Sequence, residues 1–161
     1  KAASFKPTIQ LIHANAKEWI AEKKYVFIIA NPPFFENHLP STDETRRLAR
    51  HTDSLTLATL TARCARLLQP LGELYLLLPA SSQNQILETL SQNQFSTHTI
   101  TSIQATPSKQ PHLIAVYAIK NSPNHIENQT PLRTIQYTHY TADGQLSPQA
   151  TELLKDFYLA L

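Results

Sequence analysis

The sequence predicts an α/β layer fold with a mainly parallel sheet, and its 161 residues suit one domain over 1–161. Strand-like and helix-like hydrophobic patterns alternate along the chain, which is the order of β-α-β units. Tyr25–Ala30 is a continuous apolar run, typical of a strand buried on both faces of a sheet. The last two predicted strands have no helix between them, so we expect one of them to run antiparallel at the sheet edge.

In the first third of the chain, residues 8–13 alternate apolar and polar side chains and predict a strand, and residues 16–24 predict a short helix. The run Tyr25–Ala30 stops at Asn31, because the two prolines that follow lack the N–H groups of a strand ladder. Residues 36–54 are polar and irregular, which is typical of a solvated loop.

The rest of the chain continues the alternation. The expected elements are a helix over 55–68, a strand over 73–78, a helix over 81–92, strands over 95–103 and 112–120, and an amphipathic helix over 148–161. Pro70 ends the first of these helices and Gly72 turns the chain, whereas Ser81 or Ser82 can cap the second. A proline-containing loop separates the last strand from the last helix.

Composition excludes several classes of site. The two glycines, Gly72 and Gly144, cannot form a Gly-x-Gly-x-x-Gly dinucleotide turn or a Walker-type phosphate loop. Cys64 falls on the apolar stripe of a predicted helix, which indicates a buried structural thiol. The seven histidines lack metal-ligand spacing, so no metal site is expected, and no apolar stretch is long enough to predict a membrane span. A net charge of +2 permits a polyanionic partner.

The most informative motif is Asn31-Pro32-Pro33-Phe34-Phe35, which directly follows the apolar strand. Asn and Pro also end strands as ordinary turn residues, but the strand before them and the two aromatic side chains after them favour a functional loop. The motif resembles the signature of class I S-adenosylmethionine-dependent methyltransferases that modify planar amino groups. That resemblance implies a Rossmann-like fold and a role for each residue of the motif. The catalytic residues would be Asn31, Pro32 and Phe34, and the substrate would also contact Pro33 and Phe35.

Flanking segments narrow the resemblance. Residues 49–52 (Ala-Arg-His-Thr), 67–72 (Leu-Leu-Gln-Pro-Leu-Gly), 143–144 (Asp-Gly) and 154–159 look like the bacterial tRNA1(Val) adenine-37 N6-methyltransferases. The resemblance covers most of the chain from about residue 8. It implies S-adenosyl-L-methionine as cofactor, tRNA as substrate, methylation of the exocyclic N6 of an adenine, and a cytoplasmic location.

The chemistry of that reaction suits the motif. An aromatic exocyclic amine is a poor nucleophile, because its lone pair is delocalised into the ring. Two acceptors aimed at its hydrogens, the side-chain carbonyl of Asn31 and the backbone carbonyl of Pro32, favour a pyramidal nitrogen and stabilise its growing positive charge. A residue before a proline is biased to an extended backbone, so both acceptors are held in place. The ring of Phe34 offers a stacking face for the base.

The cofactor side departs from the family pattern. The relatives carry an acidic, glycine-rich turn after their first strand and an acid after the second, and this sequence contains neither, as expected of an N-terminally truncated catalytic domain. Asn15 stands where the family usually has an Asp that contacts the cofactor adenine, and Val26 stands where many relatives have an Asp. The resemblance therefore leaves Asn15 and Asn31 as cofactor-binding residues.

We expect these 161 residues to bind S-adenosylmethionine weakly or not at all, because two segments through which the relatives hold the cofactor are absent. Isothermal titration calorimetry of the chain with the cofactor measures the affinity directly. A version that restores upstream residues is the matched comparison. Tight binding by the 161 residues alone would contradict the expectation.

A cationic cluster follows the motif. Its members are Arg46, Arg47, Arg50 and His51, and Lys109, from the loop before the last strand, extends it. Beside the entrance to the pocket these side chains can contact phosphates of a nucleic-acid substrate, and an ordinary solvated loop is the alternative. We interpret Arg63 and Arg66 as solvent-facing charges of a helix.

Other functions stay open on the sequence alone. A release-factor glutamine methyltransferase typically has Tyr where this chain has Phe34, and a DNA adenine methyltransferase usually adds a target-recognition domain, for which no sequence remains. A guanine-N2 rRNA methyltransferase also uses Asn-Pro-Pro-Phe. A rival of a different class is a non-catalytic RNA-binding module with a Rossmann-like fold and no cofactor.

Overall fold

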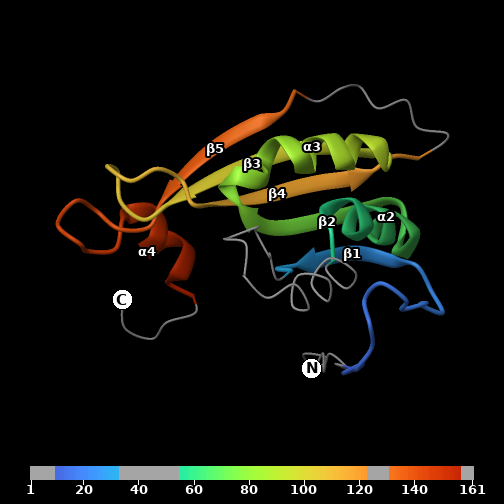
Figure 1. Ribbon diagram of the computed structural model, residues 1–161. Helices are drawn as coiled ribbons and strands as arrows, with labels where there is room; N and C mark the ends of the chain where they lie inside the picture. The colour runs from blue at the N-terminus through green and yellow to red at the C-terminus, as the bar shows by residue number, and fades with distance from the viewer. Residues whose placement is uncertain (1–9, 33–54, 123–130, 157–161) are drawn as a thin grey trace, which may run out of the picture.

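The computed structural model describes residues 10–32, 55–122 and 131–156, and its centre is a five-stranded sheet of order β1-β2-β4-β3-β5. The strands are β1 (Tyr25–Ala30), β2 (Leu68–Pro79), β3 (Phe95–Gln104), β4 (Leu113–Lys120) and β5 (Arg133–Thr138). The helices are α2 (Leu57–Leu67), the 3-10 turn η1 (Ala80–Ser82), α3 (Gln83–Gln92) and α4 (Pro148–Leu154) (Figure 1). This arrangement confirms the predicted α/β fold class.

The sheet is mainly parallel, as predicted, but the position of the antiparallel strand differs from the expectation. Strands β1, β2, β3 and β5 run parallel, and β4 runs against its neighbours β2 and β3 in the middle of the sheet rather than at the edge. A short connection, residues 105–112, joins β3 to β4, and short connections favour antiparallel neighbours. Strand β5, which the sequence did not predict, then pairs with the free side of β3 and takes the edge.

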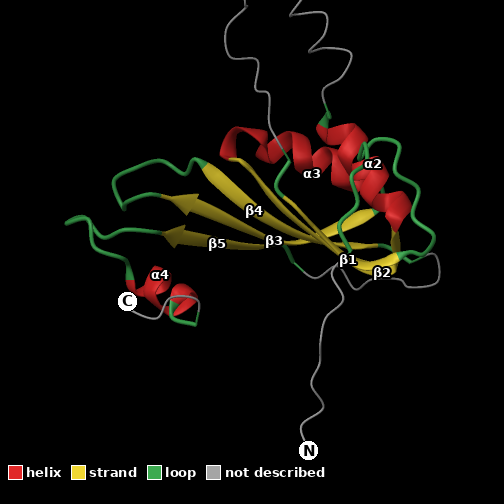
Figure 2. Cartoon of the chain, turned by 90° about the horizontal axis from the view of Figure 1, so that it is seen from below, coloured by secondary structure: helices red, strands yellow, loops and turns green. Residues whose placement is uncertain are grey.

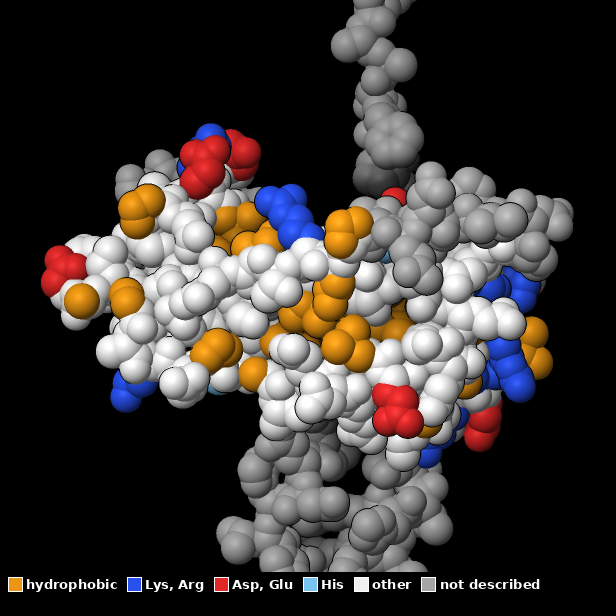
Figure 3. Space-filling model, turned by 90° about the horizontal axis from the view of Figure 1, so that it is seen from above, with side chains coloured by type: hydrophobic (Ala, Val, Ile, Leu, Met, Phe, Trp, Pro, Cys, Tyr) orange, Lys and Arg blue, Asp and Glu red, His pale blue; other side chains and the backbone are white. Residues whose placement is uncertain are grey.

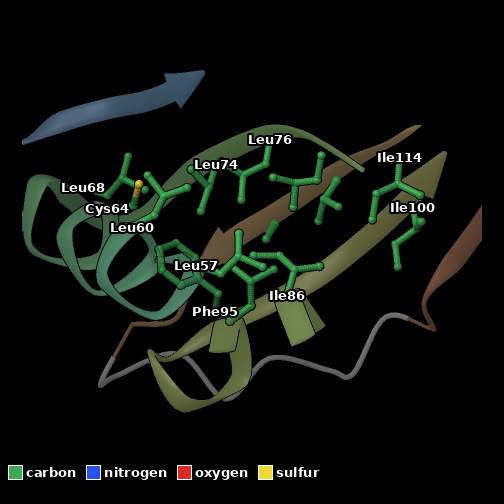
Figure 4. Packing of buried hydrophobic residues seen from close by; sticks show 14 residues of the cluster. Leu57, Leu60, Cys64, Leu68, Leu74, Leu76, Ile86, Phe95, Ile100 and Ile114 are labelled. Carbon is green, nitrogen blue, oxygen red and sulfur yellow. The ribbon is translucent and has the colours of Figure 1, made fainter. Parts of the chain in front are cut away.

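The hydrophobic core lies on one face of the sheet, under α2 and α3 (Figure 2). Alternate residues of the central strands point into it, together with one stripe of each helix (Figure 4). The largest fully buried side chains are Leu68, Leu74, Leu78, Ile86, Leu90, Ile100, Ile114 and Thr61. Cys64 is 3% exposed, and burial raises the pKa of its thiol to about 11, so the thiol stays protonated at neutral pH. The prediction of a buried structural cysteine is confirmed.

Strand β1 has the predicted bounds but not the predicted burial. The side chains of Val26, Phe27 and Ile29 are 62%, 59% and 72% exposed. Within the described residues, β1 pairs on one side only, with β2, and only Ile28 and Ala30 pack against the core. Both faces of β1 are apolar, which is why its sequence is continuously apolar. The described residues cover one of these faces, and only in part.

Two lysines hold the junction between α2 and β2. The Nζ atom of Lys120 donates to the backbone oxygens of Ala65 (2.5 Å) and Leu68 (2.9 Å), and Lys24 Nζ donates to the oxygen of Arg66. These are carbonyls at the end of a helix, where positive charge is favourable. Burial, with a smaller effect from Lys24, lowers the pKa of Lys120.

The predicted turn at Pro70 and Gly72 is present, but it lies within β2. Tyr25 pairs with Leu68 and Phe27 pairs with Glu73, so residues 69–72 bulge out of the ladder. Gly72 is required there, because a Cβ atom would lie 2.9 Å from the backbone oxygen of Gln69.

Several local expectations are wrong. Residues 10–13 are irregular rather than a strand, and the predicted helix over 16–24 is only a turn at 16–18. Ser82 is the N-cap residue of α3 but makes no capping hydrogen bond with its side chain, because the chain enters the helix through η1 instead of an extended residue. The predicted ends at residues 8–9 and 157–161 lie outside the described residues.

Candidate active site

The candidate site lies where the parallel strands end. Strands β1, β2, β3 and β5 all finish at one end of the sheet, on the left in Figure 1. In open α/β sheets, ligands bind beyond the carboxyl ends of the strands. Asn31 and Pro32 follow β1 directly and therefore lie at this end, as the sequence predicts.

Asn31 lies where β1 ends earlier than its neighbour β2. Ala30, the last residue of β1, pairs with Leu76, whereas β2 continues to Pro79 and pairs there with the start of β4. The chain leaves the ladder at Asn31 because Pro32 has no N–H to donate. Asn31 is exposed and Pro32 is buried, so an accessible amide stands beside a fixed proline.

The neighbouring loops are fixed by backbone hydrogen bonds. Ala80 N donates to His112 O (3.0 Å), and His112 N donates to Ile103 O (3.0 Å), which ties the exit of β2 to the loop between β3 and β4. Lys109 lies in that loop, exposed, in a turn closed by its own N–H and Thr106 O (3.1 Å). The structure thus brings Lys109 to the same end of the sheet as Asn31.

The other residues of the predicted substrate side cannot be placed. They lie outside the described residues and are Pro33, Phe34, Phe35, Arg46, Arg47, Arg50 and His51. Their roles stay predictions from the sequence.

Asn15 lies in a separate, exposed turn. Its Oδ1 accepts the N–H of Lys17 (3.0 Å), and its Nδ2 donates to Glu18 Oε1 (3.4 Å). The side chain of Arg63 donates to the backbone oxygens of Ala16 (3.4 Å) and Trp19 (2.5 Å), so it holds this turn against α2. Arg63 is therefore half-buried rather than solvent-facing, whereas Arg66 is exposed as expected.

A pocket elsewhere in the molecule does not belong to this site. It has a volume of about 290 Å³ and is lined by Gln10, Ile12, Trp19, Glu22, Lys23 and Tyr25. Tyr25 begins β1 and Asn31 follows its end, so a six-residue strand, about 20 Å long, separates the two. Within ranges 10–32, 55–122 and 131–156, no group of three or more His, Cys, Asp or Glu could hold a metal ion, and no helix is long and apolar enough to cross a membrane.

The sequence reasoning missed the residues at the carboxyl end of β5. Tyr137, His139 and Tyr140 come together there at the same end of the sheet as Asn31. The signal in the sequence is weak, because only two apolar residues of this strand, Ile135 and Tyr137, alternate with polar ones.

Comparison with known proteins agrees with this geometry. No protein-family model matches the chain. Over 98% of its length it is 27% identical to a protein of Parabacteroides distasonis and 26% identical to one of Shewanella woodyi, and over 94% it is 30% identical to one of Shewanella baltica. All three relatives are named tRNA1(Val) (adenine(37)-N6)-methyltransferase. The chain is similar to tRNA1(Val) adenine-N6 methyltransferases. It covers 65%, 67% and 63% of the length of these three relatives.

Solved structures support the same fold. A predicted O-methyltransferase of Agrobacterium tumefaciens matches 88% of this chain and 60% of its own, with a TM-score of 0.55 and 16% identity. The M1.HpyAVI–SAM complex matches 80% of this chain and 65% of its own, with a TM-score of 0.50 and 20% identity. The described residues therefore have the Rossmann-like α/β fold of class I methyltransferases, as the sequence predicts.

Proposed function

We propose that the protein is an S-adenosylmethionine-dependent methyltransferase that acts in the cytoplasm on the N6 of an adenine in tRNA. The observation that carries the proposal is the exposed amide of Asn31 beside the buried Pro32, at the carboxyl end of a parallel strand. The names of the relatives, which match nearly the whole chain, support the substrate and the position of the methyl group. The SAM complex among the similar structures supports the cofactor.

In this proposal the protein acts mainly by positioning. The Asn31 side-chain oxygen and the Pro32 backbone oxygen accept hydrogen bonds from the adenine amine, which favours a pyramidal nitrogen and stabilises its growing positive charge. The cofactor supplies a methyl group already activated on a sulfonium, so the chain needs neither a metal nor a covalent nucleophile. On the cofactor side, Asn15 stays a prediction from the sequence: in its own turn, separate from Asn31, its Oδ1 accepts the Lys17 N–H and its Nδ2 donates to Glu18.

Transfer of a labelled methyl group to tRNA tests the proposal. A cofactor-binding form of the protein, with upstream residues restored, is mixed with labelled S-adenosylmethionine and bulk tRNA, and the tRNA is then digested to nucleosides. N6-methyladenosine is the expected product. Parallel reactions contain rRNA or a release factor in place of tRNA, and transfer to the guanine N2 of the rRNA or to a glutamine of the release factor would instead favour one of the alternatives. Absence of transfer to any of the three substrates from a protein with bound cofactor would contradict enzymatic function.

The cationic cluster provides a prediction for RNA binding. Replacement of Arg50 by alanine is expected to weaken tRNA binding at low salt, and the loss should shrink at high salt because the release of counterions into more concentrated salt gains less free energy per phosphate contact. Fluorescence anisotropy with labelled tRNA at several salt concentrations measures both effects. Arg66→Ala is the matched control, because Arg66 is exposed on α2. Equal affinities of the Arg50 and Arg66 variants at low salt would mean that the cluster is an ordinary solvated loop without a role in RNA binding.

A further inference from the structure

An aromatic cluster stands at the carboxyl end of β5. A hydrogen bond of 3.1 Å joins Tyr137 Oη to His139 Nδ1, and the two ring centroids are 6.0 Å apart. The ring of Tyr140 meets the His139 ring edge-on, with centroids 4.4 Å apart and an interplanar angle of 84°. Tyr140 is 40% exposed, whereas Tyr137 and His139 are half-buried behind it. The cluster therefore presents one accessible ring that contacts His139, which is itself bonded to Tyr137.

The backbone beneath the cluster is held on the side of β3. His139 N donates to Gln104 O (3.0 Å) and Tyr140 N donates to Ala105 O (2.8 Å), which extends the parallel pairing beyond the end of β5. Gln104 is buried, and its Nε2 donates to Thr138 Oγ1 (2.9 Å). These bonds fix the position of the rings before any ligand binds.

Helix α4 holds the same segment from the other side. Ser147 N donates to His139 O (2.9 Å), and the Ser147 hydroxyl donates to Thr138 O (2.5 Å) while it accepts the N–H of Ala150 as the N-cap of the helix. Gln149 Oε1 accepts the N–H of Thr138 (3.0 Å) on the outer edge of β5. The outer edge is thus occupied by the protein itself, and the exposed feature is the Tyr140 ring.

The cluster lies within reach of a ligand bound at Asn31. Both are at the same end of the sheet, but the register sets Ala30 of β1 level with Thr134 of β5, so Tyr140 lies four strand positions across and several residues further along. At the usual strand spacing and rise per residue, Tyr140 is about 25 Å from Asn31. Between them lies the loop that begins at Ala105, the partner of Tyr140, and carries the exposed Lys109. A folded RNA easily spans this separation.

The charges nearby favour contact through one lysine and an aromatic ring rather than through a broad basic patch. Among the described residues, the Lys and Arg side chains on the face seen in Figure 3 lie at several separate places, with several of them near the right edge. Asp143, in the loop after Tyr140, is exposed, and a hydrogen bond from Thr141 lowers the pKa of its carboxyl, so it stays negative at neutral pH. Phosphate is therefore favoured on the side of Lys109.

We propose that Tyr140, held by the His139 and Tyr137 cluster, is a stacking platform for an unpaired base of the substrate RNA, with Lys109 at the adjoining phosphate. The inference rests on the proposed function for its ligand, an RNA that also reaches Asn31. Proteins that recognise RNA stack unpaired bases on Tyr and His rings, and such contacts tolerate different bases. A pre-fixed, exposed ring is well suited to this contact, because little conformational freedom is lost when the base binds.

Binding to two RNA probes tests the inference without any methyl transfer. The purified protein is titrated into a fluorescent single-stranded oligoribonucleotide and into a fully paired RNA duplex, and anisotropy gives the affinities. Tyr140→Ala is expected to weaken binding of the single strand about 5- to 150-fold and to leave duplex binding nearly unchanged. Tyr140→Phe keeps the ring and should bind like the wild type. Lys109→Ala should produce a loss that falls with salt, whereas the loss from Tyr140→Ala should not.

The outcomes separate this inference from the proposed function. Unchanged single-strand affinity in Tyr140→Ala, or an equal loss with the duplex, overturns the stacking platform whether or not the protein methylates tRNA. Conversely, a loss of affinity in Tyr140→Ala that is confined to the single strand supports the stacking platform even if no methyl transfer is found. In that case only the enzymatic proposal fails. Circular dichroism of each variant shows that the exposed substitution has not unfolded the protein.

Discussion

In a cofactor-binding form of the protein, with upstream residues restored, replacement of Asn31 by alanine is expected to slow methyl transfer about 100- to 1,000-fold while cofactor affinity and folding stay nearly unchanged. The amide oxygen acts mainly on the nitrogen whose charge grows in the transition state, and loss of one such fixed partner costs about 2.7–4 kcal/mol at comparable sites. Asn31 is exposed, so the substitution removes no core packing. Single-turnover transfer of labelled methyl to tRNA measures the rate, and calorimetry measures the cofactor affinity.

Asn31→Asp is the finer variant. It keeps an acceptor oxygen but adds a charge and removes the amide donor, so we expect partial activity between that of the wild type and that of Asn31→Ala. If Asn31→Ala methylates as fast as the wild type, the motif only ends β1 and the catalytic role of Asn31 is wrong.

Leu78→Ala is expected to lower the free energy of unfolding by about 2–5 kcal/mol, which for a chain of this length lowers Tm by roughly 4–20 °C. Leu78 is 0% exposed and points into the core from β2, next to the end of the sheet that carries the site. Its removal leaves a cavity that the surrounding side chains fill only in part. Thermal unfolding followed by circular dichroism measures the change.

Leu153→Ala provides the matched control for this stability prediction. It makes the same chemical change on α4, where the leucine side chain is 59% exposed, and should alter stability by no more than about 0.5 kcal/mol. Equal destabilisation by the two substitutions would mean that the core is not where the sheet and α2 and α3 place it.

The parts of the fold that could be predicted are those with a strong periodicity of their own. Helix α3 and strand β4 have apolar side chains at the spacing of the structure that they form, and their positions are confirmed. Strand β2 is confirmed over the predicted residues 73–78 but begins earlier, at Leu68. Residues 10–13 alternate in the same way but are irregular, because a strand also needs a partner, and they pair with no described strand even though one side of β1 is free. Pairing, unlike periodicity, is a long-range property.

Strand β5 shows the opposite case. Only Ile135 and Tyr137 are apolar within it, and most of its side chains are exposed or half-buried, so a sequence pattern carries little signal. The strand forms because β3 has a free side, along which Thr99 to Gln104 pair with Arg133 to Thr138. Strand β5 can therefore be predicted only after β3 and its free side have been located in the sheet.

The candidate site could be predicted only as far as one motif reaches. Asn31 was located correctly because a buried-type strand followed by prolines gives its position in any parallel sheet. Tyr137, His139 and Tyr140 could not be associated with it, since they approach the same end of the sheet through the unpredicted pairing of β5 with β3. Their contribution depends on topology rather than on residue type.

The one-sided pairing of β1 has a consequence for what the stability of this protein means. Strand β1 is bonded only to β2 among the described strands, and its ladder is interrupted between Tyr25 and Phe27. Local opening of such an edge costs less free energy than unfolding of the sheet centre, where β4 is paired on both sides. Asn31 is attached to this edge, so the population of molecules with a correctly placed amide is governed by the local opening of β1. Global stability and competence of the site are therefore separate quantities, and a substitution that strengthens the centre of the sheet need not hold Asn31 any more firmly.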